Sequence, residues 1–285
     1  MELHLFRWHV ATDGYVIREL PGEGGKPGGR CLALTNWPHT ELRHYGLQRD
    51  EPGLFRQFAD LDGSDDAILQ FARRYGMLGV GQWVASEGEH LLPEPLALWH
   101  EETAAMRYGI ALWEAWRDGP FDRLTQLVAE DGQAMFWQEE RIGSRGTEPW
   151  VLALSCGAAH RPEPHVEAEP TPARLAIARL AALIDSRMRE HVRARFLVDE
   201  STRRPRLAVV PSNLLGGLWC QFADAIDQRR KHRPCALPDC PRWFLEEPTR
   251  GPEPKRYCSE ACRKRAHYRS NPEKYRRKKE GKTQA

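Results

Sequence analysis

The sequence predicts an α+β fold that is mainly α, with a small N-terminal strand region, a helical body and a C-terminal treble-clef-like module that contains four cysteines. Three observations support this class. Residues 1–50 are rich in strand and turn formers, helical periodicity begins near Leu54, and four of the seven cysteines lie within residues 235–262. With 285 residues, 41% of them hydrophobic, the chain can bury a sizeable core without needing a metal to fold.

The N-terminal strands flank a glycine-rich loop. The stretches GYVIREL and RCLALTNW have strand composition, and PGEGGKPGG between them is typical of a flexible hairpin loop. A phosphate-binding loop of the Walker type needs Ser or Thr after its lysine, whereas Pro27 follows Lys26. We therefore expect a hairpin here rather than a phosphate site.

The residues that follow are predicted to form helices. Ser64 is a suitable N-cap, Asp65 and Asp66 favour the first turn of a helix, and Gly76 is a suitable C-cap. Further helices are expected where apolar residues recur at helical spacing, over residues 96–118, 121–130, 172–188 and 212–228.

Composition divides the chain into five segments. The stretch AAHRPEPHVEAEPTP favours a linker because it is rich in Pro and Glu, and ARFLVDESTRRPRLAVV is typical of a hairpin around a polar turn. The expected segments are an N-terminal domain (1–157), the linker (158–172), a helical and hairpin segment that packs on the body (173–230), the cysteine module (231–270) and a basic tail (271–285).

The distribution of charge separates an acidic body from a basic end. Residues 228–285 contain 18 Lys and Arg against 7 Asp and Glu, a net charge of +11, whereas residues 1–227 contain 24 against 33, a net charge of −9. A basic segment of this kind attracts polyanions. The sequence contains neither an apolar membrane segment nor a secretory signal, so we expect a cytoplasmic protein whose thiols stay reduced.

The cysteine spacing predicts a metal site. Four residues separate Cys235 from Cys240, 17 separate Cys240 from Cys258, and three separate Cys258 from Cys262. Four thiolates complete the tetrahedral coordination of one structural Zn²⁺ and leave no open position for a substrate. Another metal or a reducible disulfide remains an alternative.

The predicted module has a knuckle, a hairpin and a helix, in that order. Pro238-Asp239 favours a turn between the first two cysteines. We expect Trp243–Leu245 to pair with Arg256-Tyr257 as two short strands, and a helix to begin at Ser259 and end near Ser270, before Asn271-Pro272.

The helix and the tail contain the predicted contacts to nucleic acid. At 100° per residue, Lys264, His267 and Tyr268 point away from Cys262, whereas Ala266 and Arg269 return toward the metal side. The predicted contact residues are Arg263, Lys264, Arg265, His267, Tyr268, Arg269, Lys274, Arg276 and Arg277. DNA is the expected ligand. RNA, acidic protein partners, a merely solvated basic face and a homo-oligomer stay open, because phosphate attraction does not distinguish the two nucleic acids.

The stretch KRYCSEACRKR resembles the CGNR-type zinc finger found at the C-terminus of bacterial proteins described as stress-induced transcription regulators. It keeps Cys258-Ser259, Cys262 and Arg265, whereas Arg263 and Lys264 replace the Gly and Asn of that family. The resemblance covers about residues 214–275. It implies a zinc module, DNA binding and a role in transcription regulation. From the cysteine spacing and the division of charge, we expect the acidic N-terminal body to be a sensor or assembly element.

Two other functions stay open. One is a zinc-stabilised protein-interaction or assembly protein that binds no nucleic acid. The other is a nuclease or toxin-like enzyme that the finger directs to nucleic acid, with metal-binding carboxylates at Asp60, Asp62, Asp65 and Asp66. We expect no enzymatic activity, because a loop and a helix start account for these aspartates, and Cys156 has the character of a buried thiol.

Overall fold

The computed structural model describes residues 6–20, 29–36, 40–80, 93–130, 171–199, 204–246 and 254–271. The chain divides into two compact units: unit 1 comprises Met1–Trp99 and His191–Ala285, and unit 2 comprises His100–Glu190. All but the last two residues of the expected linker lie outside the described residues, so the five predicted segment boundaries stay predictions.

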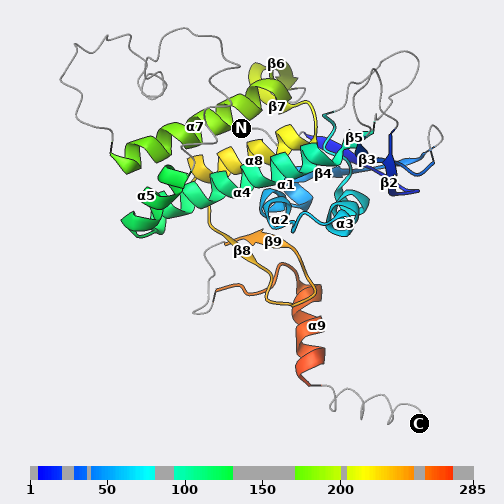
Figure 1. The fold of residues 1–285 in the computed structure, drawn as a ribbon. Helices are drawn as coiled ribbons and strands as arrows, with labels where there is room; N and C mark the ends of the chain where they lie inside the picture. Colours follow the sequence, from blue (N-terminus) through cyan, green and yellow to red (C-terminus); the bar gives the residue numbers. More distant parts are fainter. Residues whose placement is uncertain are drawn as a thin grey trace. The chain divides into compact units, whose positions relative to one another are not determined.

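The predicted fold class is confirmed, because small strand pairs and longer helices make up the described chain (Figure 1). The strands are β1 (Arg7–Ala11), β2 (Tyr15–Glu19), β3 (Arg30–Leu34), β4 (Leu42–Gly46), β5 (Glu94–Pro95), β6 (Val192–Asp199), β7 (Arg204–Pro211), β8 (His232–Pro234) and β9 (Trp243–Leu245). The helices are α1 (Leu47–Asp50), α2 (Leu54–Ala59), α3 (Asp65–Tyr75), α4 (Leu96–Asp118), α5 (Phe121–Glu130), α7 (Pro172–His191), α8 (Leu214–Asp227) and α9 (Glu260–Ser270). None of these helices has the length and apolar character needed to cross a lipid bilayer.

The sheets of unit 1 are small and antiparallel. β2 pairs with β3, which confirms the predicted N-terminal hairpin, and β6 pairs with β7, which confirms the second one. β1 pairs with β4, and β5 adds to the outer edge of β3. Helix α3 contacts β1 and β2. The glycine-rich loop at residues 21–28 lies outside the described residues.

Local sequence determines where α3 and α8 begin. The hydroxyl of Ser64 accepts a hydrogen bond from the backbone N–H of Ala67 at 3.2 Å, and the side chain of Asn213 accepts one from the N–H of Gly216 at 2.8 Å. These contacts satisfy donors that the first turn of a helix leaves unpaired. Gly76 follows α3 with a φ of 93°, as expected for a glycine that ends a helix.

Helix α8 is the centre of the core of unit 1. Trp219 and Phe222 are fully buried, and the ring of Phe222 stacks on Phe55 of α2 with 5.6 Å between centroids. A Cβ atom at position 216 would lie 2.3 Å from the carbonyl oxygen of His191, so only glycine fits this approach. The apolar helix predicted over residues 212–228 is thereby confirmed.

Glu94 connects three segments of the same core. Its carboxylate, 1% exposed, accepts hydrogen bonds from the backbone N–H groups of Leu78 (3.0 Å), Gly79 and Val80 (3.2 Å), and from Nε1 of Trp99 (3.0 Å). Burial raises the pKa of Glu94 to about 7, although these donors favour the charged form. One acidic side chain thus joins a loop, β5 and the first turn of α4.

Unit 2 contains α5 and most of α4 and α7. The bounds of α4 and α5 agree with the prediction, and Met106 and Trp113 of α4 are buried. Arg187 of α7 forms a largely buried ion pair with Glu102 of α4 at 2.9 Å. Cys156, which the sequence predicts to be a buried thiol, lies outside the described residues.

Candidate metal centre and basic helix

The side chains of Cys235, Cys240, Cys258 and Cys262 converge in unit 1, with all four sulfur atoms within 4.8 Å of one another. The Sγ–Sγ distances are 3.6 Å between Cys240 and Cys258, 3.5 Å between Cys258 and Cys262, and 3.7 Å between Cys262 and Cys240. Thiolates bound at about 2.3 Å to one tetrahedral ion lie about 3.8 Å apart, whereas the sulfurs of a disulfide lie about 2.05 Å apart. The four side chains can therefore hold a metal ion, as the spacing predicts.

Short-range hydrogen bonds shape the two loops that present the sulfurs. In the first loop, Cys240 N donates to the carbonyl oxygen of Leu237 at 2.9 Å, which closes the turn between the first two cysteines. In the second, Ser259 caps α9 by accepting a hydrogen bond from Cys262 N at 3.2 Å, so the last cysteine lies in the first turn of the helix as predicted. Leu237 is 1% exposed, and Tyr257 packs against this cluster.

The prediction that Trp243–Leu245 pairs with Arg256-Tyr257 is wrong. Trp243–Leu245 does form a strand, but β9 pairs with β8 at His232–Pro234, on the other side of the first cysteine pair. Residues 256 and 257 form no strand. Instead, the carbonyl oxygen of Arg256 accepts a hydrogen bond from Ala236 N at 2.9 Å, which ties this segment to the first loop. The loop that contains Cys235 and Cys240 is therefore the turn of the hairpin, because β8 and β9 flank it and pair with each other.

The thiols differ in acidity. Hydrogen bonding to Ser259 lowers the pKa of Cys262 to about 7, whereas burial raises the pKa of Cys240 and of Cys258. A divalent cation favours the thiolate form of every ligand, so metal affinity at this site falls as the pH falls.

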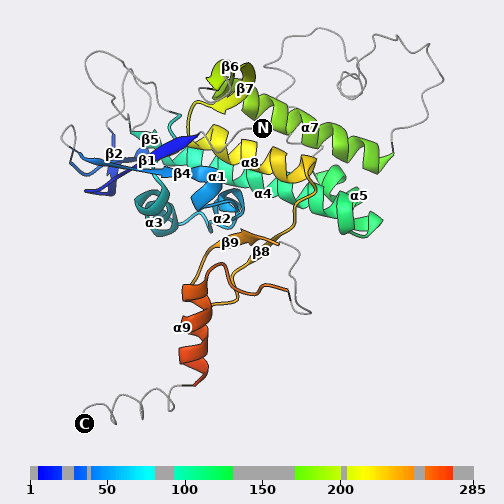
Figure 2. The same ribbon diagram turned by 180° about the vertical axis from the view of Figure 1, so that it is seen from behind.

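The cysteine module contacts the helical part of unit 1 through β9. Nε1 of Trp243 donates to a carboxylate oxygen of Asp60 at 2.7 Å, and Arg242 forms an ion pair with Glu51. The guanidinium of Arg56 lies 5.2 Å from the centre of the Trp243 ring. A Cβ atom at Gly53 would lie 2.7 Å from that of Trp243, so glycine permits the close approach. In both views, β8 and β9 lie between α2 and α9 (Figures 1 and 2).

Sequence reasoning did not predict this contact surface, because its residues are separated by almost 200 positions and follow no local pattern. One cue was present in the sequence, which is rich in tryptophan. The predicted module gives the indole of Trp243 no role, and this indole contacts the helical part of unit 1.

Helix α9 presents its basic residues as the predicted geometry requires. Arg269 returns toward the metal side and forms an ion pair with Asp239 of the first loop, which lowers the pKa of that carboxyl group. Arg263 forms an ion pair with Glu260 at 2.7 Å. The remaining predicted contact residues of the helix are exposed, namely Lys264, Arg265, His267 and Tyr268. Lys274, Arg276 and Arg277 lie outside the described residues.

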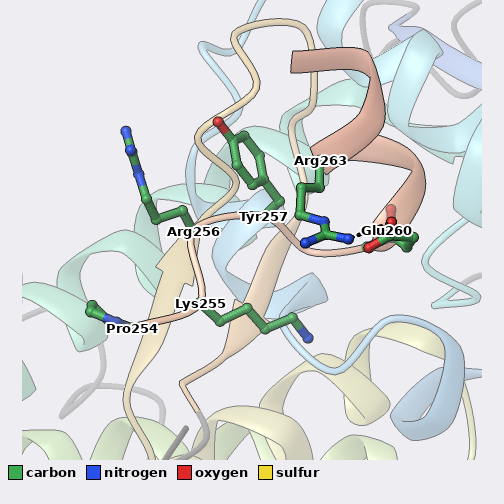
Figure 3. Close-up of a pocket in the computed structure, with 7 residues that line it drawn as sticks. Pro254, Lys255, Arg256, Tyr257, Glu260 and Arg263 are labelled. Carbon is green, nitrogen blue, oxygen red and sulfur yellow. Dashed lines mark hydrogen bonds and ion pairs between the residues drawn. The ribbon is translucent and has the colours of Figure 1, made fainter. Parts of the chain in front are cut away.

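A surface hollow of about 440 Å³ lies beside the start of α9. Its lining residues are Pro254, Lys255, Arg256, Tyr257, Ser259, Glu260 and Arg263. Figure 3 shows Arg263 and Glu260 facing each other across their ion pair, whereas Arg256 and Lys255 extend in different directions from the chain. Sequence reasoning left Lys255 and Arg256 out of the contact residues, although both belong to the same basic stretch.

Three of the four aspartates considered for a nuclease site have separate structural partners. Asp60 accepts the hydrogen bond from Trp243, Asp62 accepts one from Ser64 N at 2.8 Å, and Asp65 forms an ion pair with Arg30. Among the described residues, the four cysteines are the only group of three or more side chains placed to hold a metal. No described arrangement therefore favours catalysis by these carboxylates.

Comparison of the chain with protein-family models, with curated proteins and with solved structures found no match. The resemblance of its C-terminal tract to the CGNR-type finger stays a prediction.

Proposed function

We propose that this protein binds nucleic acid through a zinc module, and that DNA is its ligand in a role in transcription regulation. The observation that carries the proposal is the combination, in one small module, of a four-sulfur metal site with an exposed basic helix. Residues 254–271, which include α9, contain six Lys and Arg against one Glu. The proposal assigns a binding role and no catalysis.

Zinc is the metal that this ligand set favours. Four cysteine sulfurs at tetrahedral separations are the donors that structural Zn²⁺ prefers, and a saturated site offers no position for substrate. The metal would orient α9 through Cys262, and Arg269 would add a second link between helix and knuckle. The basic face of α9 would then meet a phosphate backbone as a fixed surface rather than as a flexible segment.

The proposal is tested by measuring the binding of the full chain to fluorescent nucleic acids over a series of salt concentrations. A 30-base-pair DNA duplex, single-stranded DNA and single-stranded RNA of the same length are the probes. We expect Lys264→Gln/Arg265→Gln to weaken binding by about 10-fold or more and to lower the slope of log K against log salt by about 2, because two phosphate contacts are lost.

The matched control is Arg7→Gln/Arg43→Gln, which removes the same charge from two exposed positions on β1 and β4. The control should bind like the unmodified protein. Equal affinities for the module variant and the control would overturn the proposal. A mass that falls when the metal is chelated, with no affinity for any probe, would support the assembly protein instead.

A further inference from the structure

The strands β6 and β7 form a two-stranded ribbon (Figure 1), whose β7 is buried at Ala208 and Pro211 and whose β6 is exposed from Arg193 to Phe196. The backbone N–H and the hydroxyl of Ser212 both donate to the carbonyl oxygen of His191 at 2.8 Å, and Pro211 is buried. Eight residue pairs join the strands without interruption, and no other described strand pairs with them. Strands of eight residues extend about 26 Å, so the ribbon is long for a two-stranded element.

One face of the ribbon exposes large apolar side chains. Phe196 is 78% exposed, Val198 66% and Leu207 65%. Phe196 lies directly opposite Leu207 and Val198 opposite Pro205, so all four residues lie on the same face. A two-stranded ribbon has no core of its own, and a contiguous apolar stripe on it is typical of a binding surface.

The opposite face of the ribbon carries exposed arginines. Arg193 and Arg195 of β6 are exposed and lie on the face away from Phe196. Neither Arg193 nor Arg195 forms an ion pair in the part of the chain that the structure describes. Asp199 is the one acidic residue in the two strands, against four arginines. The ribbon thus combines an excess of positive charge with an exposed aromatic ring.

We propose that the β6–β7 ribbon is a second nucleic-acid-binding element, in which Arg193 and Arg195 contact phosphates and Phe196 contacts bases. Guanidinium groups bind phosphate oxygens in pairs, and aromatic rings stack on unpaired bases or insert between base pairs. A two-stranded ribbon also fits the width of the DNA major groove. The element uses residues separate from the zinc module, so it does not depend on binding by that module.

A second copy of the chain is the competing partner for the apolar stripe. The stripe is one side chain wide on each strand, which is small compared with the roughly 800 Å² that each partner buries in a stable dimer. Two ribbons would also bring together two positively charged elements. A nucleic acid matches both faces, because it offers phosphates to the arginines and planar bases to Phe196.

The test uses the full chain and the same three probes. Arg193→Gln/Arg195→Gln should weaken binding by about 10-fold and lower the salt slope by about 2 on every probe. Phe196→Ala should weaken binding by about 5-fold or more, most strongly on the single strands if the ring stacks and on the duplex if it inserts. Phe196→Tyr should restore affinity, because tyrosine keeps the ring.

The controls separate this proposal from the function proposed for the zinc module. Arg7→Gln/Arg43→Gln controls for loss of charge, and Trp116→Ala controls for loss of an exposed aromatic residue, since Trp116 is 44% exposed. If the ribbon variants bind like these controls while Lys264→Gln/Arg265→Gln binds weakly, the ribbon proposal is wrong and the module proposal stands. The reverse pattern supports the ribbon alone. Loss of a dimer in Phe196→Ala, with unchanged affinity for the probes, would identify the second copy as the partner.

Discussion

The core around α8 and the cysteine module are stabilised in different ways. Eleven of the 14 residues of α8 are buried, including five large aromatic or aliphatic side chains with no exposed surface, Leu214, Leu215, Leu218, Trp219 and Phe222. Among the described residues of the module, from β8 onward, the buried side chains are Cys235, Leu237, Phe244 and Cys262. Apolar burial on this scale does not maintain a fold by itself, so we expect the module to depend on a metal bound by the four cysteines, and the core not to. Metal loss and core damage should therefore have separable effects.

Loss of one thiolate should produce the largest effect, and it should be confined to the module. Zinc binding contributes on the order of 10 kcal/mol to the folding of small zinc modules. We expect Cys258→Ser to lose the metal, and the amides of residues 254–271 to exchange rapidly while those of α8 stay protected. Metal analysis and hydrogen exchange measure the two effects.

Cys220→Ala is the control for this variant, because it removes a buried thiol from α8 without touching the metal site. It should retain one metal ion per chain. If the amides of α8 lost protection together with those of the module in Cys258→Ser, the two regions would not be independent.

Damage to the core should have the opposite pattern. Trp219→Ala leaves a cavity beside Phe222 and should reduce the free energy of unfolding by about 3–5 kcal/mol, as measured by urea denaturation. The metal content of the folded protein should not change. Trp116→Ala, at a position 44% exposed, should change the free energy of unfolding by less than about 0.5 kcal/mol. Loss of metal from Trp219→Ala while it is folded would contradict the separation.

Glu94 should make the stability of the core depend on pH. Its pKa is about 7 in the fold against 4.5 in the unfolded chain, so between these values the folded state retains a proton that the unfolded state has lost. The free energy of unfolding should therefore fall as the pH rises from 4.5 to 7, by at most about 1.4 kcal/mol per pH unit from this one group.

The comparison variant for this prediction is Glu94→Gln. Its side-chain N–H₂ would face the N–H groups of loop 78–80, which should cost about 1–3 kcal/mol, and the variant should lose this part of the pH dependence. Urea denaturation at pH 5, 6 and 7 measures the difference between the two proteins. A difference that is the same at every pH would show that Glu94 titrates normally.

The smallest effect is expected where the two regions meet. The hydrogen bond from Trp243 to Asp60 lies at the surface and should contribute about 1 kcal/mol. A double-mutant cycle with Trp243→Phe and Asp60→Ala measures this coupling from urea denaturation. Both single variants should keep the metal. A coupling energy of zero would show that the contact of β9 with α2 does not depend on this bond.

Helix ends and the metal site were predictable because their determinants lie close together in the sequence. Ser64, Asn213 and Ser259 each contact a backbone N–H three residues away, and such contacts follow from residue type and spacing. The pairing of β8 with β9 was not predictable in the same way. Two segments can each read as a strand, but hydrogen bonding between them depends on where the intervening loop brings them.

Several helix ends, the clustering of four cysteines and the basic character of the C-terminal end follow from the sequence alone, because caps, periodicity, ligand spacing and charge are local properties. The contacts between distant residues depend on the tertiary structure. Gly53 lies close to Trp243 because glycine has no Cβ atom. The carboxylate of Glu94 accepts hydrogen bonds from loop 78–80 because both are buried in the same core. The exposure of Phe196 is likewise a tertiary property, since an apolar residue in a strand is buried or exposed according to what packs on that face.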